Sequence, residues 1–343
     1  MRAAIYYHNR DVRVEETPVP QIGPGELLLR IEASGICGSD VMEWYRVKKA
    51  PLVLGHEVAG EVAEVGPGVS KYKVGDRVVA SHHVPCNTCR YCLSGHPTVC
   101  DTLRATQFDP GGFAEYVRLP AINVDRGVYL IPAGVSWEAA SLTEPLACVL
   151  RGQRIAQVGL GDTVAVVGTG IAGLLHIQSA RAAGATKIFG IDIEEKRLSE
   201  AKRLGADMAI HGDENPVDQI KRANDGFLAD KVLVCTGAES AVRQALELVE
   251  RGGRVLFFAP TEPGVTVSLS VNDLFFGNDV TLTTSYAGSP ADHWMALDLI
   301  ASNRVAVDTL ISHRLPLSEI QQGFNLVSDA KACLKVIIEP QRQ

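Results

Sequence analysis

Four cysteines follow one another at short spacing, in the pattern Cys86-x2-Cys89-x2-Cys92-x7-Cys100. Four thiolates at such spacing can close a tetrahedron around a zinc ion, and a closed four-sulfur site is structural because it leaves no open position for a substrate. An iron–sulfur cluster is one alternative, since its motifs also begin with Cys-x2-Cys-x2-Cys, and free or redox-active thiols are another. The long x7 gap and the absence of a proline after Cys100 favour structural zinc.

A glycine-rich stretch follows a run of apolar residues and reads Gly168-Thr169-Gly170-Ile171-Ala172-Gly173. Between a strand and a helix, such glycines allow a tight turn and close approach of the backbone to a pyrophosphate, which the free N–H groups of the helix start attract. Asp192 ends the next expected strand, 19 residues beyond Gly173. A carboxylate there accepts hydrogen bonds from ribose hydroxyls and repels a 2′-phosphate, so the pattern predicts NAD rather than NADP or a plain glycine turn. The other residues expected at the cofactor are Arg197, Cys235 and Thr236.

A third group is dispersed along the chain. It comprises Cys37 and Ser39 in Gly35-Ile36-Cys37-Gly38-Ser39-Asp40, His56 in Gly55-His56-Glu57, and Glu144 in Thr143-Glu144-Pro145. Taken singly, side chains of these types are more often packed or solvated than bound to a metal. Their meaning depends on whether the fold brings them together.

The totals limit the classes of protein that the chain can belong to. Its 343 residues exceed one ordinary core, so we expect two domains. A net charge of −7 argues against a nucleic-acid-binding or anionic-membrane surface. We find no signal-peptide pattern and no convincing membrane span, and in such a chain clustered cysteines indicate metal sites rather than disulfides. We therefore expect a cytoplasmic protein.

Hydrophobic patterning divides the chain near residue 153. The first part is β-rich, with strands expected at 3–7, 26–33, 57–65 and 77–81, which suggests a barrel or sandwich. Beyond it, strands (163–167, 187–191, 231–234, 254–258, 280–284) alternate with helices (172–183, 194–204, 239–250, 291–302). This alternation, with strands that are apolar nearly throughout, predicts an α/β domain with a parallel sheet covered on both faces. A last strand at 334–339 is expected to rejoin the first domain.

Together these motifs resemble those of the zinc-containing medium-chain dehydrogenases over essentially the whole chain. The matching stretches are Gly35–Asp40, Gly55–Glu57, Val65–Val69 with Val74–Val78, the four cysteines, Gly112–Tyr116, Glu144–Leu146 and the nucleotide motif. Glu144-Pro145 is typical of the sorbitol and threonine dehydrogenase branch. The resemblance implies a GroES-like catalytic domain (residues 1–152 and 289–343) with a structural-zinc lobe at about 84–102, and a doubly wound Rossmann NAD-binding domain (residues 153–288).

The resemblance also assigns roles. Cys37 and His56 would ligate a catalytic zinc, with Glu57 as a third ligand and Glu144 as a fourth ligand or as a partner of the bound water. Ser39 would take the substrate proton; its alternative is a turn serine that caps a short helix. The implied activity is NAD-dependent oxidation of a secondary hydroxyl of an alcohol or polyol to a carbonyl, with L-threonine or a sugar phosphate as alternative substrates.

Two residues depart from the family pattern. Members commonly have a proton-carrying histidine where this chain has Met42, so we expect the proton to leave through a ribose hydroxyl and water. Ser285 stands before Tyr286 where sorbitol dehydrogenases carry an arginine, which lowers the expectation for sorbitol itself.

Other readings stay open. A zinc-free quinone or enoyl reductase shares the fold but lacks the full ligand set, and a non-catalytic NAD-binding scaffold is a further alternative. Family members are commonly homodimers or homotetramers, and we expect the same here. The remaining residues of interest are expected to be solvated loop histidines (His82, His83, His96), a packed helical histidine (His176) and buried cysteines (Cys148, Cys235, Cys333).

Overall fold

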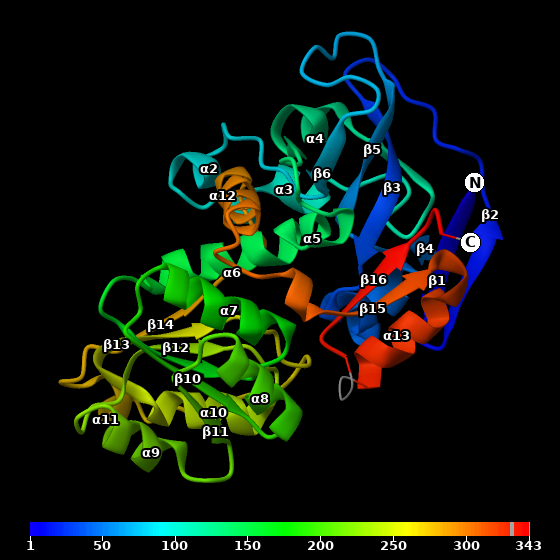
Figure 1. Ribbon diagram of the computed structural model, residues 1–343. Coiled ribbons are helices and arrows are strands. Elements are labelled where there is room, and N and C mark those ends of the chain that lie inside the picture. Colours follow the sequence, from blue (N-terminus) through cyan, green and yellow to red (C-terminus); the bar gives the residue numbers. More distant parts are fainter. Residues whose placement is uncertain (330–332, 343) are drawn as a thin grey trace. The chain divides into compact units, whose positions relative to one another are not determined.

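The computed structural model describes residues 1–329 and 333–342, and their contacts divide the chain into two compact units (Figure 1). Unit 1 comprises Met1–Ala147 and Ala287–Gln343, and unit 2 comprises Cys148–Tyr286. The sequence analysis expects a catalytic domain at residues 1–152 and 289–343 and an NAD-binding domain at residues 153–288. This assignment of functions to the two parts of the chain stays a prediction. Each unit is described by itself below.

Unit 1 is built on β-sheets. A seven-stranded sheet runs in the order β15-β16-β3-β5-β6-β8, with β7 also paired to β3, and a smaller sheet runs β2-β1-β4. The large sheet's strands are β3 (Leu27–Gly35), β5 (Glu57–Val65), β6 (Arg77–Ser81), β7 (Tyr116–Leu119), β8 (Val128–Leu130), β15 (Ile311–Pro316) and β16 (Lys335–Glu339). The small sheet's strands are β1 (Arg2–His8), β2 (Asp11–Glu16) and β4 (Leu52–Val53). Alternate residues such as Leu27, Leu29 and Ile31 point into a common apolar core, which explains the strand periodicity.

The last strand, β16, completes the sheet beside residues from the start of the chain. It pairs antiparallel with β3, Ile337 opposite Gly35, and β3 pairs in turn with β5, Gly35 opposite Glu57. The expectation that the final strand rejoins the first domain's sheet is therefore confirmed. As a result, β3 lies between the strand that carries Lys335 and the strand that carries Glu57.

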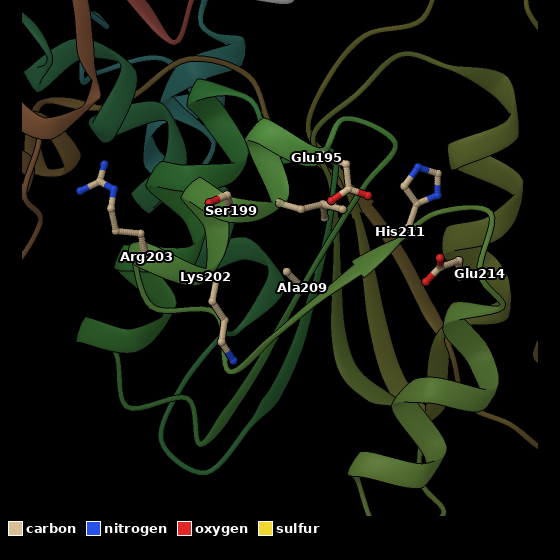
Figure 2. Close-up of a pocket in the computed structure, with 8 residues that line it drawn as sticks. Glu195, Ser199, Lys202, Arg203, Ala209, His211 and Glu214 are labelled. Atoms are coloured by element: carbon tan, nitrogen blue, oxygen red, sulfur yellow. The ribbon is translucent and has the colours of Figure 1, made fainter.

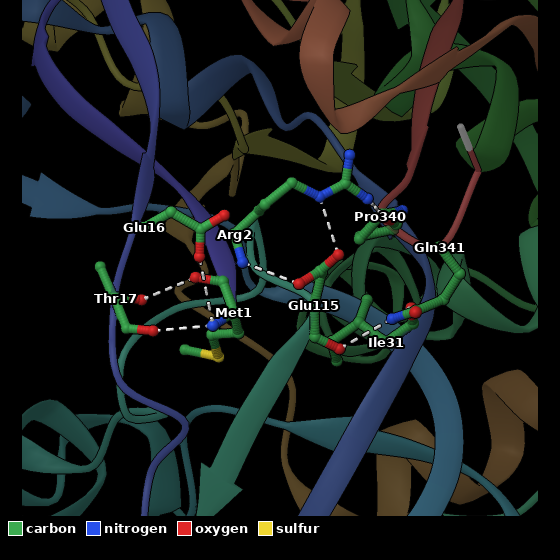
Figure 3. Close-up of polar contacts among 8 residues, drawn as sticks. All are labelled: Met1, Arg2, Glu16, Thr17, Ile31, Glu115, Pro340 and Gln341. Atoms are coloured by element: carbon green, nitrogen blue, oxygen red, sulfur yellow. Dashed lines mark hydrogen bonds and ion pairs between the residues drawn. The ribbon is translucent and has the colours of Figure 1, made fainter.

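Polar contacts tie the two chain ends into unit 1 (Figure 3). The Arg2 guanidinium forms an ion pair of 2.8 Å with Glu115 and donates to the Pro340 carbonyl over 3.0 Å. The Gln341 side chain donates to the carbonyls of Glu115 and Ile31. These bonds fix the end of β16 against β3 and the segment before β7.

Unit 2 contains six parallel strands in the order β11-β10-β9-β12-β13-β14. They are β9 (Thr163–Val167), β10 (Lys187–Asp192), β11 (Met208–His211), β12 (Ala229–Val234), β13 (Val249–Phe257) and β14 (Thr281–Thr284). The order reverses between β9 and β12, which is the doubly wound arrangement that binds dinucleotides at its switch point. Helices cover both faces of the sheet (Figure 1), among them α7 (Ile171–Ala182), α8 (Glu195–Arg203), α9 (Pro216–Ala223) and α10 (Glu239–Glu247). The predicted fold class is confirmed.

Sequence patterning missed several elements. Strand β11, helix α9, and helices α6 (Thr143–Ala156) and α13 (Ile320–Asp329) were not expected. Helix α6 matters most, because it carries Glu144 in its first turn. Within the described residues, no helix combines the length and apolar character that crossing a bilayer requires.

Candidate metal centres and cofactor site

The four cysteines of the predicted lobe converge. One ligand atom from each of Cys86, Cys89, Cys92 and Cys100 lies within 4.8 Å of all the others. Neighbouring sulfurs are 3.6 Å apart for Cys89–Cys92 and Cys86–Cys100, and 4.0 Å apart for Cys86–Cys92. A zinc tetrahedron with metal–sulfur bonds of about 2.3 Å needs sulfurs about 3.8 Å apart. The donor set and its spacing therefore fit zinc.

Local hydrogen bonds favour the thiolate form of Cys86 in this cluster. Donors from Thr88, its side chain first and then its backbone, together with the backbone N–H of Cys89, lower the pKa of Cys86 to about 5. The Cys89 N–H lies 3.2 Å from the Cys86 sulfur. Since the thiolate is the form that binds metal, these N–H groups prepare the site for a cation.

A second cluster contains three of the four residues predicted for the catalytic metal. Ligand atoms of Cys37, His56 and Glu57 all lie within 4.8 Å of one another. Cys37 follows β3 and caps the short 3₁₀ helix Gly38–Val41, while His56 and Glu57 stand at the start of β5. Glu144 is buried on α6 but is not a member of this group. The structure thus brings three predicted ligands together and leaves Glu144 outside the cluster.

Glu57 meets a cation that the sequence analysis did not consider. Its carboxylate forms an ion pair with the ammonium of Lys335, and the two side chains are 1% and 2% exposed. The Lys335 ammonium also donates to the carbonyl of Ile36 over 3.0 Å. Burial is the largest single influence and lowers the pKa of Lys335, but the charges of Glu57, Cys37 and Asp40 with the hydrogen bond to Glu57 together outweigh it and raise the pKa above its usual value. Lys335 is therefore a buried, charged partner of a predicted metal ligand.

The environment of the two Glu57 oxygens shows whether a metal ion fits this cluster. Both oxygens are buried without a hydrogen-bond donor, but Oε2 forms the ion pair with Lys335, whereas Oε1 has no charged partner among the described residues either. A buried carboxylate oxygen without a partner is costly, because burial removes its water. A cation beside Cys37 and His56 would satisfy it, and thiolate, imidazole and carboxylate are ligands that zinc accepts.

Asp40 contacts two members of this cluster, His56 and Cys37. Its carboxylate is fully buried, with Oδ1 3.4 Å from His56 Nδ1 and Oδ2 accepting the Cys37 N–H over 3.0 Å. Burial opposes ionisation of both groups, yet their mutual attraction lowers the pKa of Asp40 and raises that of His56 well above its usual value. A carboxylate on one ring nitrogen fixes the imidazole and leaves the other nitrogen for a metal.

Ser39 lies between Cys37 and a basic side chain. The Arg46 guanidinium donates to the Ser39 hydroxyl oxygen over 3.0 Å and to the Ser39 carbonyl over 2.9 Å. It also approaches Asp40 at 3.4 Å. Arg46 is at the end of helix α1 (Glu43–Arg46), one turn beyond Met42.

Two histidines near this cluster were misjudged from sequence. His82 and His83 are half-buried rather than solvated, and the His82 ring packs 4.9 Å from His56 and 3.8 Å from His83. Burial lowers the pKa of His83 to about 4. His96 is exposed, as expected. The error has a physical origin: these histidines follow β6 directly, and β6 pairs with β5.

The glycine-rich turn of unit 2 follows β9. Gly168 has a φ of 90°, which a residue with a side chain rarely adopts. A Cβ at Gly173 would lie 2.0 Å from the Gly168 carbonyl oxygen, whereas a Cβ at Gly170 would meet no atom within 4 Å. The first and third glycines are therefore required by the turn and by packing. The second leaves the open approach that a pyrophosphate needs at the start of α7.

Asp192 ends β10 beside this turn. One of its oxygens accepts the Thr169 N–H over 2.7 Å, and the other accepts the N–H of Ile193 over 2.8 Å. Arg197 lies 3.7 Å from the same carboxylate. Asp192 is thus buried and well bonded within the chain, so ribose hydroxyls would have to share or replace these donors.

The other residues of interest in unit 2 lie where the topology predicts. Cys235 and Thr236 follow β12, and a Cβ at Gly168 would lie 3.0 Å from the Thr236 Cβ. Burial raises the pKa of the Cys235 thiol. His176 is fully buried on α7, as expected, while Cys148, Cys235 and Cys333 are half-buried.

A separate hollow of about 640 Å³ lies between α8 and β11 (Figure 2). Its lining mixes acidic and basic groups, among them Glu195, Lys202, Arg203 and Glu214, with His211 at the end of β11. Neither Asp192 nor the glycine-rich turn lines it. Mixed charge and the absence of any nucleotide-site residue separate this hollow from the predicted cofactor site.

Sequence reasoning missed three residues of unit 1 that contact predicted functional groups. Asp40 carried a signal, since it stands three residues after Cys37 within one turn. Arg46 carried a weaker one, at one helical turn from Met42. Lys335 had only its charge in an otherwise apolar strand as a signal, because nearly 300 residues separate it from Cys37.

Comparison with known proteins agrees with this geometry. The family described as alcohol dehydrogenase GroES-like domain matches residues 23–131, and the family described as zinc-binding dehydrogenase matches residues 172–302. An L-threonine 3-dehydrogenase of Bacillus velezensis is 36% identical over 95% of each chain. A sorbitol dehydrogenase of Halalkalibacterium halodurans is 33% identical, also over 95% of each chain. The solved alcohol dehydrogenase TADH of Thermus sp. ATN1 is 32% identical and superposes with a TM-score of 0.86 over 99% of each chain.

Proposed function

The chain belongs to the zinc-containing medium-chain dehydrogenase family, in its sorbitol and threonine dehydrogenase branch, and we propose that it oxidises a secondary hydroxyl of a polyol or related alcohol to a carbonyl with NAD. The observation that carries the proposal is the convergence of Cys37, His56 and Glu57 within 4.8 Å, with a buried Glu57 oxygen that lacks a partner. A scaffold without activity has no need of such a cluster.

Cys37, His56 and Glu57 would hold the catalytic zinc, and the four-cysteine cluster would hold a structural one. When bound, the catalytic zinc would act as a Lewis acid on the substrate oxygen, while the nicotinamide would accept the hydride. Asp40 would keep the His56 ring in place through Nδ1. Glu144, buried on α6, would act on water near the metal rather than as a resting ligand, because it lies outside the three-residue group.

Ser39 would receive the proton from the substrate hydroxyl. It stands two residues after Cys37, and its oxygen already accepts a hydrogen bond from Arg46. Since a guanidinium has donors only, the hydroxyl hydrogen of Ser39 must point to another acceptor. Proton exit through a ribose hydroxyl and water fits this arrangement, because Met42 cannot carry a proton.

The preference for NAD rests on Asp192. Its carboxylate at the end of β10 would repel a 2′-phosphate, and the open space beside Gly170 would admit the pyrophosphate. Arg197, 3.7 Å from Asp192, partly offsets the negative charge. We therefore propose a preference for NAD that is not absolute.

L-threonine is the second candidate substrate. The relative from Bacillus velezensis is named L-threonine 3-dehydrogenase, and its identity with this chain, 36%, exceeds that of the sorbitol dehydrogenase, 33%. Threonine also carries a secondary hydroxyl, so the same metal and proton chemistry would serve. Sugar phosphates are less favoured, because two cations at the catalytic cluster are already engaged: Arg46 is bonded to Ser39 and Asp40, and Lys335 to Glu57.

An NAD-coupled screen tests the proposal. Reduction of NAD is followed with secondary alcohols, four- to six-carbon polyols and L-threonine, with and without a zinc chelator. The expected result is chelator-sensitive reduction with at least one polyol or with threonine. Turnover that resists metal removal, or no reduction with any substrate, would reject the proposal.

The expected assembly and location are also proposals. We propose a homodimer or homotetramer that works in the cytoplasm. Light scattering coupled to size-exclusion chromatography gives the mass in solution, and a mass of 36.8 kDa would contradict the assembly.

A further inference from the structure

The buried ion pair between Glu57 and Lys335 joins two strands that are not neighbours in the sheet. Lys335 is on β16 and Glu57 on β5, and both strands flank β3. Strands two positions apart are separated by about 10 Å, so a side chain on the middle strand normally stands between their side chains. At this place the middle strand carries Gly35, directly opposite Glu57.

Gly35 leaves the space in which the two charges meet. A Cβ at residue 35 would lie 2.0 Å from Glu57 Oε2 and 2.8 Å from Lys335 Cε. The φ of Gly35 is not one that only glycine adopts, so space rather than backbone conformation is what a side chain would violate. Gly35, Glu57 and Lys335 therefore form one arrangement across three strands.

The ammonium is directed at the metal ligands rather than at solvent. Lys335 is 2% exposed, and its other hydrogen bond goes to the carbonyl of Ile36, the residue before Cys37. Within the described residues, Asp40 is the other side chain that forms an ion pair with a member of the Cys37–His56–Glu57 group, through His56. Lys335 thus contacts the backbone next to one ligand and the carboxylate of another.

We propose that Lys335 is the positioning residue of the catalytic metal centre: it holds Oε2 of Glu57 so that Oε1 alone faces the metal, and Glu57 bridges the ammonium and the ion. The inference rests on the proposed function, since it takes Cys37, His56 and Glu57 as the ligands. A carboxylate that is also paired with an ammonium donates less electron density to the metal ion. The metal would therefore stay electron-poor and be a stronger Lewis acid.

The proposal predicts a combination of effects that a merely structural lysine would not cause. In Lys335→Met, Glu57 is released to bind the metal with its full charge. Co²⁺ should then bind roughly tenfold more tightly, in line with coupling energies between contacting residues. The visible absorption bands of the cobalt protein should shift as the carboxylate coordination changes, and kcat should fall while KM changes little. A structural role would weaken cobalt binding and activity together.

The test uses the full-length enzyme, with zinc kept in the four-cysteine site and Co²⁺ titrated into the catalytic site. Lys335→Arg, which keeps a charge, should restore the wild-type spectrum, and Lys231→Met, which removes a lysine paired with Asp162 in unit 2, serves as the matched control. In a Glu57→Gln background, Lys335→Met should cause no further spectral change, because the lysine acts through Glu57.

The double variant Glu57→Gln with Lys335→Met keeps the proposal testable if Lys335→Met alone does not fold. Lys335→Met leaves one buried charge without a partner, which can be strongly destabilising, whereas Glu57→Gln with Lys335→Met leaves none. If Lys335→Met alone does not fold, a cobalt spectrum of the double variant equal to that of Glu57→Gln supports the proposal and a different spectrum overturns it. An unchanged spectrum and affinity in folded Lys335→Met also overturns it. If wild-type protein binds no cobalt outside the cysteine cluster, the proposed function itself fails.

Discussion

The guanidinium of Arg46 donates a hydrogen bond of 3.0 Å to the hydroxyl oxygen of Ser39. Because arginine has no acceptor, this contact sets the direction of the serine O–H: its hydrogen must point away from Arg46. Residue 42 is a methionine, which cannot titrate, and Arg46 occupies the next helical turn. An arginine, which does not titrate near neutral pH, therefore lies beside the proposed proton acceptor.

Ser39→Ala should lower kcat about 100-fold, the usual contribution of a positioned proton-transfer group. Arg46→Met should lower it less, about tenfold, because it frees the serine to rotate without removing it. The matched control is Arg13→Met: Arg13 stacks on Tyr7 at 4.8 Å and pairs with an aspartate, as Arg46 stacks on Tyr45 at 4.8 Å and pairs with Asp40. Steady-state kinetics with the best substrate measure both effects. An undiminished rate in Ser39→Ala would rule out its role as proton acceptor.

Replacing one lobe cysteine should separate stability from catalysis. Cys89→Ser is expected to lose one zinc per chain and to unfold at a clearly lower temperature, because a structural zinc contributes directly to folding. Cys333→Ser, outside the cluster, is the control and should keep the zinc content. Metal analysis with thermal denaturation tests this. Full zinc content and an unchanged melting temperature in Cys89→Ser would contradict a four-sulfur site.

The buried His176 predicts a loss of stability in acid. Burial lowers its pKa to about 3, against about 6.5 in the unfolded chain. A group with a lowered pKa in the folded state binds more protons when unfolded, so its contribution is complete above about pH 6.5 and is lost as the pH falls towards 3. The Gln153 side chain, which donates to the His176 carbonyl over 2.7 Å, holds the ring's helix in place.

His176→Gln should therefore flatten the acid side of the stability curve. We expect the free energy of unfolding to fall between pH 7.5 and pH 4.5 by a few kcal/mol less in the variant than in the wild type, on the order set by a shift of this size. Urea denaturation at the two pH values measures the difference. Equal pH dependence in the two proteins would show that His176 is not buried in its neutral form.

Asp192→Asn tests cofactor selection. Removing the charge should raise the KM for NAD roughly tenfold and reduce the preference for NAD over NADP, because the 2′-phosphate is no longer repelled and Arg197 is released to bind it. The control is Asp162→Asn, in the same unit but at the other end of the sheet. The ratio of kcat/KM for the two cofactors is the measurement. A ratio that stays at the wild-type value would remove Asp192 from the ribose site.

How far the sequence predicts the structure depends on how local each determinant is. The strands at 57–65, 77–81 and 163–167 were predicted to the residue, because the first mixes apolar residues with glutamates before a Gly-Pro-Gly turn and the other two are short, largely apolar runs that follow a Gly-Asp turn. The glycine-rich turn and the cysteine lobe could be predicted equally well, since the spacing of their glycines and cysteines along the chain largely determines the local geometry. Helix α6 was missed because Pro145 lies in its first turn, where a proline is tolerated but obscures the pattern.

The surroundings of the catalytic cluster could not be predicted in the same way. Resemblance to a family pointed to Cys37, His56 and Glu57, but nothing local indicated that Lys335 reaches Glu57 across Gly35. That contact depends on the pairing of β16 with β3, which is a long-range event. His82 was judged solvated for the same reason: its burial follows from the pairing of β6 with β5.

Zinc content per chain, measured together with turnover, tests the central claim most directly. Wild-type protein should contain two zinc ions per chain, and Cys37→Ser should contain one, keep its fold and lose NAD reduction with every substrate. A preparation that holds a single zinc in the four-cysteine cluster and still reduces NAD at the wild-type rate would contradict the account.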